Sequence, residues 1–279
     1  TFVLLAALNR EGRRRGAFKG QAEPNVLDFA DLAALGTICD VVSLTGVNRA
    51  IVAQGLKVMS AWSRPGMAAL AAAAGVQGPA SPYHAGFLLG PRINAGGRVG
   101  QSDLGARLMM TQDPKEAAHI AQTLDALNAE RRAIETEVLD QAQAQVEALK
   151  LEDDTPILIA SGELWHPGVI GIVAGRIKER FNRPTIVIGV DPETGLGKGS
   201  GRSCTGVNLG AAVAAAREEG LLVAGGGHAM ACGLTVDVNR IGELTDYLTA
   251  RLKQEWIAAE EARTYSVDAV ISPSAVSFE

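Results

Sequence analysis

Residues 156–189 read PILIASGELWHPGVIGIVAGRIKERFNRPTIVIG, and this stretch decides the fold of the C-terminal half. Pro156-Ile-Leu-Ile-Ala160 and Pro184-Thr-Ile-Val-Ile-Gly189 are short β-branched runs, which are typical of buried strands. Between them, residues 169–181 place apolar side chains at helical spacing. A strand, a helix and a second strand in this order predict a right-handed crossover between two parallel strands.

The following residues predict further elements of the same α/β domain. Strands are expected at residues 196–203 and 232–238, and helices at about 209–219 and 240–256. We therefore predict a compact α/β domain with a mixed sheet over residues 151–258. The tail from Thr264 onward alternates like a strand, and residues 259–279 are predicted to be the start of a further β domain that is cut short.

A long helix is predicted upstream of this domain. It begins at Asp113-Pro-Lys-Glu116, where Asp can cap the helix, Pro suits the first turn and Glu116 can close a capping box. No glycine or further proline interrupts residues 115–150, so one helix about 50 Å long is expected over residues 113–150. Such a helix is too long for one small core, and we predict that it connects two domains.

The first 112 residues are predicted to be mainly helical. Helices are expected near residues 28–35, 47–60 and 67–74, and loops at residues 10–16 and 90–99. The chain has no initiator Met and begins on an apolar run that resembles the middle of a helix, so we expect it to be a fragment of a longer protein.

The composition is that of an ordinary globular protein, with 47% hydrophobic and 20% charged residues among 279. No apolar run approaches the roughly 20 residues of a membrane span, so no membrane partner is expected. The net charge of −5 argues against a protein coated in basic charge, although a local basic cleft remains compatible with it. Cys39, Cys204 and Cys232 lack zinc-binding spacing and indicate buried thiols in the reducing cytoplasm.

Two glycine-rich stretches carry the clearest functional signal: GKGSGRS at residues 197–203 and GGGHAMACG at residues 225–233. Bare backbone N–H groups beside Ser, Arg and His can cradle an anion, most commonly a phosphate. Either stretch alone could equally be a tight turn between strands. Because both occur close together in the sequence, a phosphate site is the better interpretation.

Asp40 follows the apolar run Leu35-Gly-Thr-Ile-Cys39. A carboxylate in such surroundings is expected to be buried and to need a partner, since an unpaired buried charge costs several kcal/mol. The partner could be a divalent metal, an arginine or a helix N-terminus. Asp28 and Asp31 are the only nearby candidates for further metal ligands, so the sequence does not assemble a complete metal site.

Two further segments carry candidate phosphate ligands. Arg92, Asn94 and Arg98 lie in the glycine-interrupted segment 90–99, which could bind phosphate or could be a plain arginine-bearing turn. His166 precedes a predicted helix start, where it could contact a phosphate, donate a proton or hydrogen-bond its own loop.

The chain resembles the RecJ-type single-stranded-DNA-specific exonucleases of the DHH/DHHA1 phosphoesterase superfamily. The resemblance covers about residues 28–256 and rests on five motifs in register: LGTICDVVSL, GPRINAGGR, WHPGVIGIVAGR, GKGSGRS and GGGHAMACG. It implies that residues 1–112 are the C-terminal part of a DHH catalytic domain and residues 151–258 a DHHA1 domain that binds phosphate and nucleic acid. It also implies 5′-to-3′ hydrolysis of single-stranded DNA to mononucleotides in DNA repair and recombination, with Mn²⁺ or Mg²⁺ as cofactor.

The resemblance also assigns roles to individual residues. Asp40 matches a metal-binding aspartate, and His228 matches a catalytic histidine in a loop that faces the scissile phosphate. Arg98, Ser200 and Arg202 match positions that hold the terminal 5′-phosphate. The remaining expected phosphate-binding residues are Arg92, Asn94, His166, Ser203, Gly225, Gly226 and Gly227.

One departure from the family is large, because the Asp-x-Asp and Asp-His-His motifs that supply most of its metal ligands are not in this sequence. The metal site should then be incomplete, and we predict that these 279 residues are inactive or nearly so. The implied partners are single-stranded DNA with a 5′ end and, for the parent protein, single-strand-binding protein or helicase partners.

Two other functions stay open: a DHH/DHHA1 phosphoesterase acting on oligoribonucleotides or small nucleotides, and a non-catalytic nucleic-acid-binding module. Because aromatic residues total only 4%, base stacking is expected to contribute little to binding. Backbone contacts should dominate instead and should weaken with salt; the arginines expected to make them are Arg92, Arg98, Arg176 and Arg202.

Overall fold

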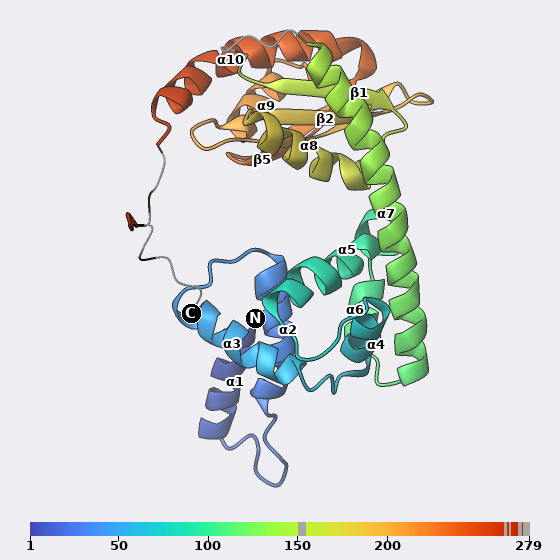
Figure 1. Ribbon diagram of the computed structural model, residues 1–279, viewed down its shortest axis with the longest axis vertical. Coiled ribbons are helices and arrows are strands. Elements are labelled where there is room, and N and C mark those ends of the chain that lie inside the picture. The colour runs from blue at the N-terminus through green and yellow to red at the C-terminus, as the bar shows by residue number, and fades with distance from the viewer. Residues whose placement is uncertain (150–154, 265–266, 268, 273–274, 276–279) are drawn as a thin grey trace. The chain divides into compact units, whose positions relative to one another are not determined.

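The computed structural model describes residues 1–149, 155–264, 267, 269–272 and 275, and it divides into two compact units (Figure 1). Unit 1 spans Thr1–Ala133 and unit 2 spans Ile134–Glu279. The predicted long helix is present as α7, Pro114–Ala148. The boundary between the units falls inside α7, because its first part packs in the core of unit 1 and its second part in a core of unit 2.

Unit 1 is helical, as predicted. Its elements are α1 (Phe2–Arg14), the 3-10 helix η1 (Val26–Phe29), α2 (Ala30–Cys39), α3 (Gly46–Met59), α4 (Pro65–Ala73), the π-helix η2 (His84–Leu89), α5 (Gly90–Val99), α6 (Leu104–Met110) and the start of α7. Helix α3 lies directly on α2 because it carries Gly55, where a Cβ would stand 2.1 Å from the carbonyl oxygen of Ala30. Leu70, Leu89, Leu108 and Leu124 are fully buried in the core.

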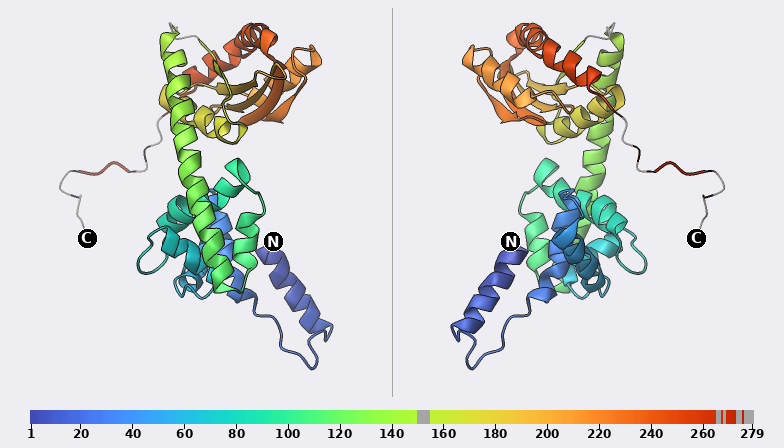
Figure 2. Two further views of the ribbon diagram at one scale, coloured as in Figure 1. Left: turned by 90° about the vertical axis from the view of Figure 1, so that its right-hand side faces the viewer. Right: turned by 90° about the vertical axis from the view of Figure 1, so that its left-hand side faces the viewer.

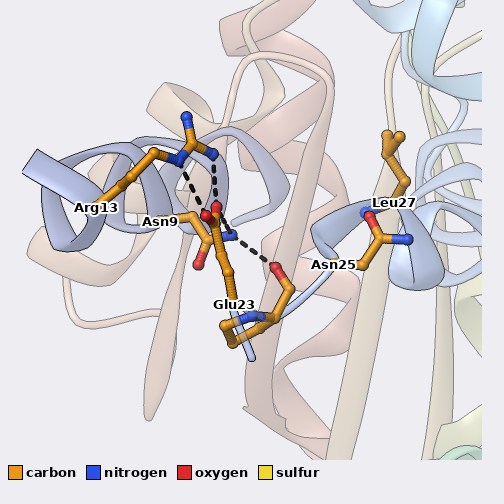
Figure 3. Close-up of polar contacts among 6 residues, drawn as sticks. Asn9, Arg13, Glu23, Asn25 and Leu27 are labelled. Carbon is orange, nitrogen blue, oxygen red and sulfur yellow. Dashed lines mark hydrogen bonds and ion pairs between the residues drawn. The ribbon is translucent and has the colours of Figure 1, made fainter. Parts of the chain in front are cut away.

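The loop predicted at residues 10–16 is wrong, because α1 continues to Arg14. Arg14 and Arg15 both pair with Glu11 about one turn earlier, at 2.6 Å, which favours the helix. Arg13 donates through Nε to Glu23 at 2.9 Å, and Asn9 donates to the Pro24 carbonyl oxygen (Figure 3). This arginine cluster therefore ties α1 to the segment that precedes η1.

The loop predicted at residues 90–99 is also wrong, because these residues form α5. Tertiary packing overrides the low helix propensity of glycine here. A Cβ at Gly90 would lie 2.5 Å from the Cys39 sulfur, and a Cβ at Gly96 would lie 2.9 Å from the Gln101 carbonyl oxygen. These glycines permit close approach within a helix instead of forming a loop.

Unit 2 contains a five-stranded mixed sheet in the order β1-β2-β3-β5-β4. Its strands are β1 (Leu158–Glu163), β2 (Thr185–Asp191), β3 (Leu196–Arg202), β4 (Ala224–His228) and β5 (Ala231–Asp237). Strands β1 and β2 are parallel and are joined through α8 (Pro167–Phe181), as the opening stretch predicts. The other pairs are antiparallel. Strand β4 was not predicted: the GGGH motif, expected as a loop, forms this edge strand.

Helices cover both faces of the sheet (Figures 1 and 2). On one face, α8 and the second part of α7 enclose a core that includes Val138, Ile170, Val173 and Val187. On the other face lie α9 (Leu209–Glu218) and α10 (Ile241–Glu261), which follows the short 3-10 helix η3 (Val238–Arg240). The α8 face of β4 and β5 stays open, since His228 and Gly233 are exposed there.

Of the tail that predicts a further β domain, residues 259–261 belong to α10, and the described residues from 264 onward (264, 267, 269–272 and 275) form no strand; the others lie outside the described residues. The domain boundaries stay predictions. In the part of the chain that the structure covers, no helix combines the length and apolarity needed to cross a bilayer.

Candidate nucleic-acid interface

Strand register brings the two glycine-rich motifs together on one face of unit 2. Residues paired across antiparallel strands share a face of the sheet. Arg202 of β3 pairs with Ala231 of β5, which pairs with His228 of β4. In the neighbouring row, Ser200 pairs with Gly233, which pairs with Gly226. These two rows, which we call the open face, lie on the α8 side of the sheet.

The floor of the open face is bare backbone. A Cβ at Gly226 would meet nothing within 4 Å, and a Cβ at Gly233 would meet only the Gly199 carbonyl oxygen at 4.0 Å. Neither position needs glycine for packing or for a positive φ. Glycine here leaves room for a group that approaches the main chain closely, as a phosphate does.

The two neighbours of Gly226 have a different environment. A Cβ at Gly225 would lie 2.9 Å from the side chains of Val213 and Leu222, and a Cβ at Gly227 would lie 2.3 Å from the Ala231 carbonyl oxygen. Both glycines are thus required by packing within unit 2. Of the three predicted phosphate-binding glycines, Gly226 alone presents its open Cα to the candidate surface.

Arg202 and Ser200 are positioned by each other and by α8. Arg202 Nη1 donates to Ser200 Oγ at 3.2 Å and to the Gly201 carbonyl oxygen at 2.8 Å. On α8, a Cβ at Gly171 would lie 2.9 Å from Ser200 Oγ and 3.0 Å from Arg202 Nη2. No carboxylate in the described part of the chain pairs with Arg202, so its charge is available to an anion.

His228 and Ser203 differ in what their side chains can do. His228 is exposed, and its Nδ1 accepts a hydrogen bond from the Met230 N–H at 3.3 Å, which leaves Nε2 for a ligand. Ser203 is only 1% exposed, and its hydroxyl donates to the Val207 carbonyl oxygen at 2.8 Å. The Ser203 hydroxyl therefore holds the turn before α9 and does not reach the open face.

His166 caps α8. Its Nδ1 accepts from the Gly168 N–H at 3.0 Å, so of its three possible roles the bond to its own loop is the one observed. His166 also lines a pocket of about 460 Å³ together with Trp165, Lys198 and Thr235. Lys198 and Thr235 pair across β3 and β5 in the row next to Ser200 and Gly233, so the pocket adjoins the open face.

Asp40 was expected to be buried, and this is wrong. It is exposed at the C-cap of α2, where the helix dipole disfavours a negative charge. Val41 follows with φ 53° and 88% exposure, an unusual conformation for a β-branched residue. Strain and an unfavourable charge at one exposed point are typical of a functional position rather than of one selected for stability.

The acidic residues near Asp40 have other partners. Buried Asp31 accepts from Arg64 Nε at 3.0 Å, and Asp28 accepts from Asn25 at 2.7 Å. Over the described ranges, no three His, Cys, Asp or Glu side chains cluster so as to hold a metal ion. Asp40 can therefore supply one carboxylate ligand, but the residues present do not make a complete metal site.

The predicted ligands of segment 90–99 separate on α5. Arg92 is only 12% exposed; its Nε donates to Asp125 at 2.8 Å and its Nη1 to the Leu88 carbonyl oxygen. Asn94 and Arg98 are exposed and lie one helical turn apart, on the same face. Arg92 thus fastens α5 to α7, while Asn94 and Arg98 are presented to solvent.

Arg176, another predicted DNA contact, forms an ion pair with Glu135 of α7. The Glu135 side chain is 3% exposed and that of Arg176 is 56% exposed. This pair fastens α8, which carries Gly171, to the second part of α7.

Comparison with known proteins identifies the domain that carries the open face. The family model described as "DHHA1 domain" matches residues 154–254, which include the whole β-sheet. Residues 154–254 form a DHHA1 domain. The open face therefore belongs to the DHHA1 domain, and the RecJ resemblance found in the motifs is confirmed over most of the chain.

Among curated relatives, the single-stranded-DNA-specific exonuclease RecJ of Dickeya dadantii is 40% identical over 270 residues, covering 93% of this chain and 46% of that protein. The RecJ of Escherichia coli is 37% identical over 275 residues, covering 93% and 48%. The chain thus spans about half the length of these relatives. The crystal structure of exonuclease RecJ bound to manganese matches 90% of this chain and 59% of its own, with a TM-score of 0.73 and 35% identity.

Sequence reasoning did not single out two glycines inside the quoted motifs: Gly171 of WHPGVIGIVAGR and Gly233 of GGGHAMACG. The spacing Gly168-x-x-Gly171-x-x-x-Gly175 was visible as a strip of small residues on one side of a helix. That Gly171 makes room for the side chains of Ser200 and Arg202 is seen only from the packing of α8 on β3.

Proposed function

We propose that this chain is the DNA-end-binding part of a 5′-to-3′ exonuclease that degrades single-stranded DNA in repair and recombination. The observation that carries the proposal is the open face, where Ser200, Arg202 and Gly226 surround bare backbone and the Arg202 guanidinium has no carboxylate partner among the described residues. The RecJ relatives, which by name act on single-stranded DNA, supply the substrate class.

The residues of the open face suit a terminal phosphate. A 5′-phosphate monoester carries more negative charge than an internal phosphodiester, so the partly exposed Arg202 favours the end of a strand. The Ser200 hydroxyl can donate a further hydrogen bond while its oxygen accepts from Arg202. Binding the 5′ end at this place would fix the direction in which the strand is degraded.

We propose Mn²⁺ or Mg²⁺ as the cofactor of the parent enzyme, because related RecJ structures are described with these ions. Such an ion would activate water and stabilise charge on the attacked phosphate. In this chain Asp40 would supply one carboxylate ligand to the ion. Because the sequence has no Asp-x-Asp or Asp-His-His motif, we propose that the isolated chain binds DNA without hydrolysing it.

The test compares the affinity of the chain for a 5′-phosphorylated single-stranded DNA oligonucleotide with that for its 5′-hydroxyl counterpart. The wild type should prefer the phosphorylated strand, and Arg202→Ala should remove this preference. Arg251→Ala is the matched control, because Arg251 is an exposed arginine on α10, which packs on the opposite face of the sheet.

Equal affinity of the wild type for both oligonucleotides would contradict an end-binding role. An RNA oligonucleotide of the same sequence forms the third arm. Preference for RNA would favour a phosphoesterase of oligoribonucleotides instead. Manganese-dependent hydrolysis by the purified chain would refute the proposal that it is inactive.

A further inference from the structure

Two aromatic side chains stack on each other at the surface of unit 1. Tyr83 and Phe87 have ring centroids 5.3 Å apart and an interplanar angle of 23°. The two residues are 59% and 66% exposed, which makes them the most exposed aromatic residues in the described part of the chain. Exposure of two rings forgoes the free energy that their burial would provide, so a purely structural role does not explain the pair.

The segment beneath the pair is firmly packed. Phe87 belongs to the π-helix η2, whose Ala85 and Leu89 are fully buried. A Cβ at Gly86 would lie 3.2 Å from the Ile38 side chain, and a Cβ at Gly90 would meet Cys39. The Cys39 thiol donates to the Ala85 carbonyl oxygen at 3.5 Å. The segment that carries the stacked rings therefore packs against the last turn of α2, which is followed by Asp40.

The same helical run continues into polar residues. From Tyr83 to Arg98 the chain is helical without a break, and its exposed side chains include Tyr83, Phe87, Asn94 and Arg98. Buried residues such as Ala85, Leu89 and Ala95 lie between them along the run. Aromatic faces are thus followed by an amide and a guanidinium.

We propose that Tyr83 and Phe87 form a stacking platform for the nucleobases of single-stranded DNA, with Asn94 and Arg98 contacting the backbone of the same strand. The inference rests on the proposed function and adds to it a base-binding site in unit 1. Aromatic side chains next to cationic groups are how sequence-tolerant single-strand binding is generally achieved. Base pairing in a duplex would keep bases from the rings, so the platform favours single strands.

The experiment measures fluorescence anisotropy of two labelled 5′-phosphorylated probes of equal length, one of mixed-sequence DNA and one of abasic sugar-phosphate, and repeats the DNA titration with a 5′-hydroxyl form of the DNA probe. The proteins are the wild-type chain, Tyr83→Ala/Phe87→Ala, Tyr83→Phe/Phe87→Tyr and Arg202→Ala. Phe29→Ala is the matched control, since Phe29 is an exposed aromatic of unit 1 outside the platform. Circular dichroism verifies that each variant is folded.

The wild type should bind the base-containing probe more tightly than the abasic probe. The double alanine variant should lose this difference, with a weakening of roughly 5- to 150-fold for each base stacked and no change for the abasic probe. The aromatic exchange and Phe29→Ala should keep the base preference. Arg202→Ala should keep it too, while losing the preference for a 5′-phosphate.

Retention of the base preference by the double alanine variant would overturn the platform. The exposed Tyr83–Phe87 pair would then be a candidate contact for another protein instead. A wild type that prefers a 5′-phosphate but does not distinguish the two probes overturns the platform and leaves the proposed function standing. A wild type without any preference for a 5′-phosphate overturns the proposed function. In that case the affinities for the DNA and abasic probes still show whether the platform binds bases.

Discussion

Replacing Gly226 or Gly227 by alanine should have opposite effects on the thermal stability of the chain, although the two residues are adjacent. An added Cβ at Gly226 meets open space, whereas at Gly227 it would lie 2.3 Å from the Ala231 carbonyl oxygen and 2.6 Å from the Cys232 Cα. Neither glycine has a positive φ, so alanine is conformationally allowed at both positions. The pair therefore separates a glycine kept for a ligand from one required by packing.

The expected magnitudes follow from these contacts. In a strand, alanine is more favourable than glycine by about 0.5–1 kcal/mol, so Gly226→Ala should be neutral or stabilising. For a unit of this size, 1 kcal/mol corresponds to about 2–4 °C in Tm. Gly227→Ala forces backbone apart, and overpacking of this kind costs about 1–3 kcal/mol. Its Tm should fall by several degrees.

The assay is calorimetry combined with tryptophan fluorescence in a Trp62→Phe background, where the remaining Trp165 and Trp256 both report on unit 2. Affinity for 5′-phosphorylated DNA is measured in parallel. Gly226→Ala should lose phosphate preference while its Tm is kept or raised. A destabilised Gly226→Ala, or a stable one with unchanged phosphate preference, would refute the assignment of the open face as a ligand site.

Three further outcomes are expected. Burial raises the pKa of the Cys232 thiol to about 11 from 9.0, so the folded state holds this proton more tightly than the unfolded state. The free energy of unfolding should therefore fall as pH rises from about 9 to 11, and in urea titrations Cys232→Ala should show a shallower fall. An equal fall in the wild type and the variant would contradict this. Arg176→Met removes the cation that pairs with buried Glu135 and should lower the free energy of unfolding by about 1.5–3 kcal/mol. Urea unfolding curves identical to those of the wild type would show that the pair contributes nothing to stability. Single-stranded DNA affinity should fall with salt, and Arg202→Ala should reduce the log–log slope by about 0.7; a slope near zero in the wild type would exclude phosphate contacts.

The sequence predicted those parts of the fold in which local pattern and tertiary packing agree. The long α7, the parallel pair β1 and β2, and the helices α8 to α10 all follow from spacing, capping and β-branched runs. Failures occurred where glycine was interpreted as a loop signal. In α5, neighbouring atoms leave no room for a Cβ at Gly90 or Gly96, so these glycines serve helix packing. In β4, pairing with β5 turns the GGGH motif into an edge strand.

The sequence pointed to the motifs of the candidate site but not to the contacts of single side chains. Glycines beside Ser200, Arg202 and His228 indicated an anion site, and register places these motifs on one face. Spacing could not tell that the Ser203 hydroxyl is used by a turn, that Arg92 pairs with Asp125, or that Asp40 is exposed. The low aromatic content likewise concealed Tyr83 and Phe87, because composition does not say which rings reach the surface.

The most direct test of the open face is a crystal structure of this chain with a short 5′-phosphorylated single-stranded oligonucleotide. We expect the terminal phosphate within hydrogen-bonding distance of Arg202 and Ser200, lying over the bare backbone of Gly226 and Gly233. A terminal phosphate bound elsewhere, with the open face empty, would contradict the account.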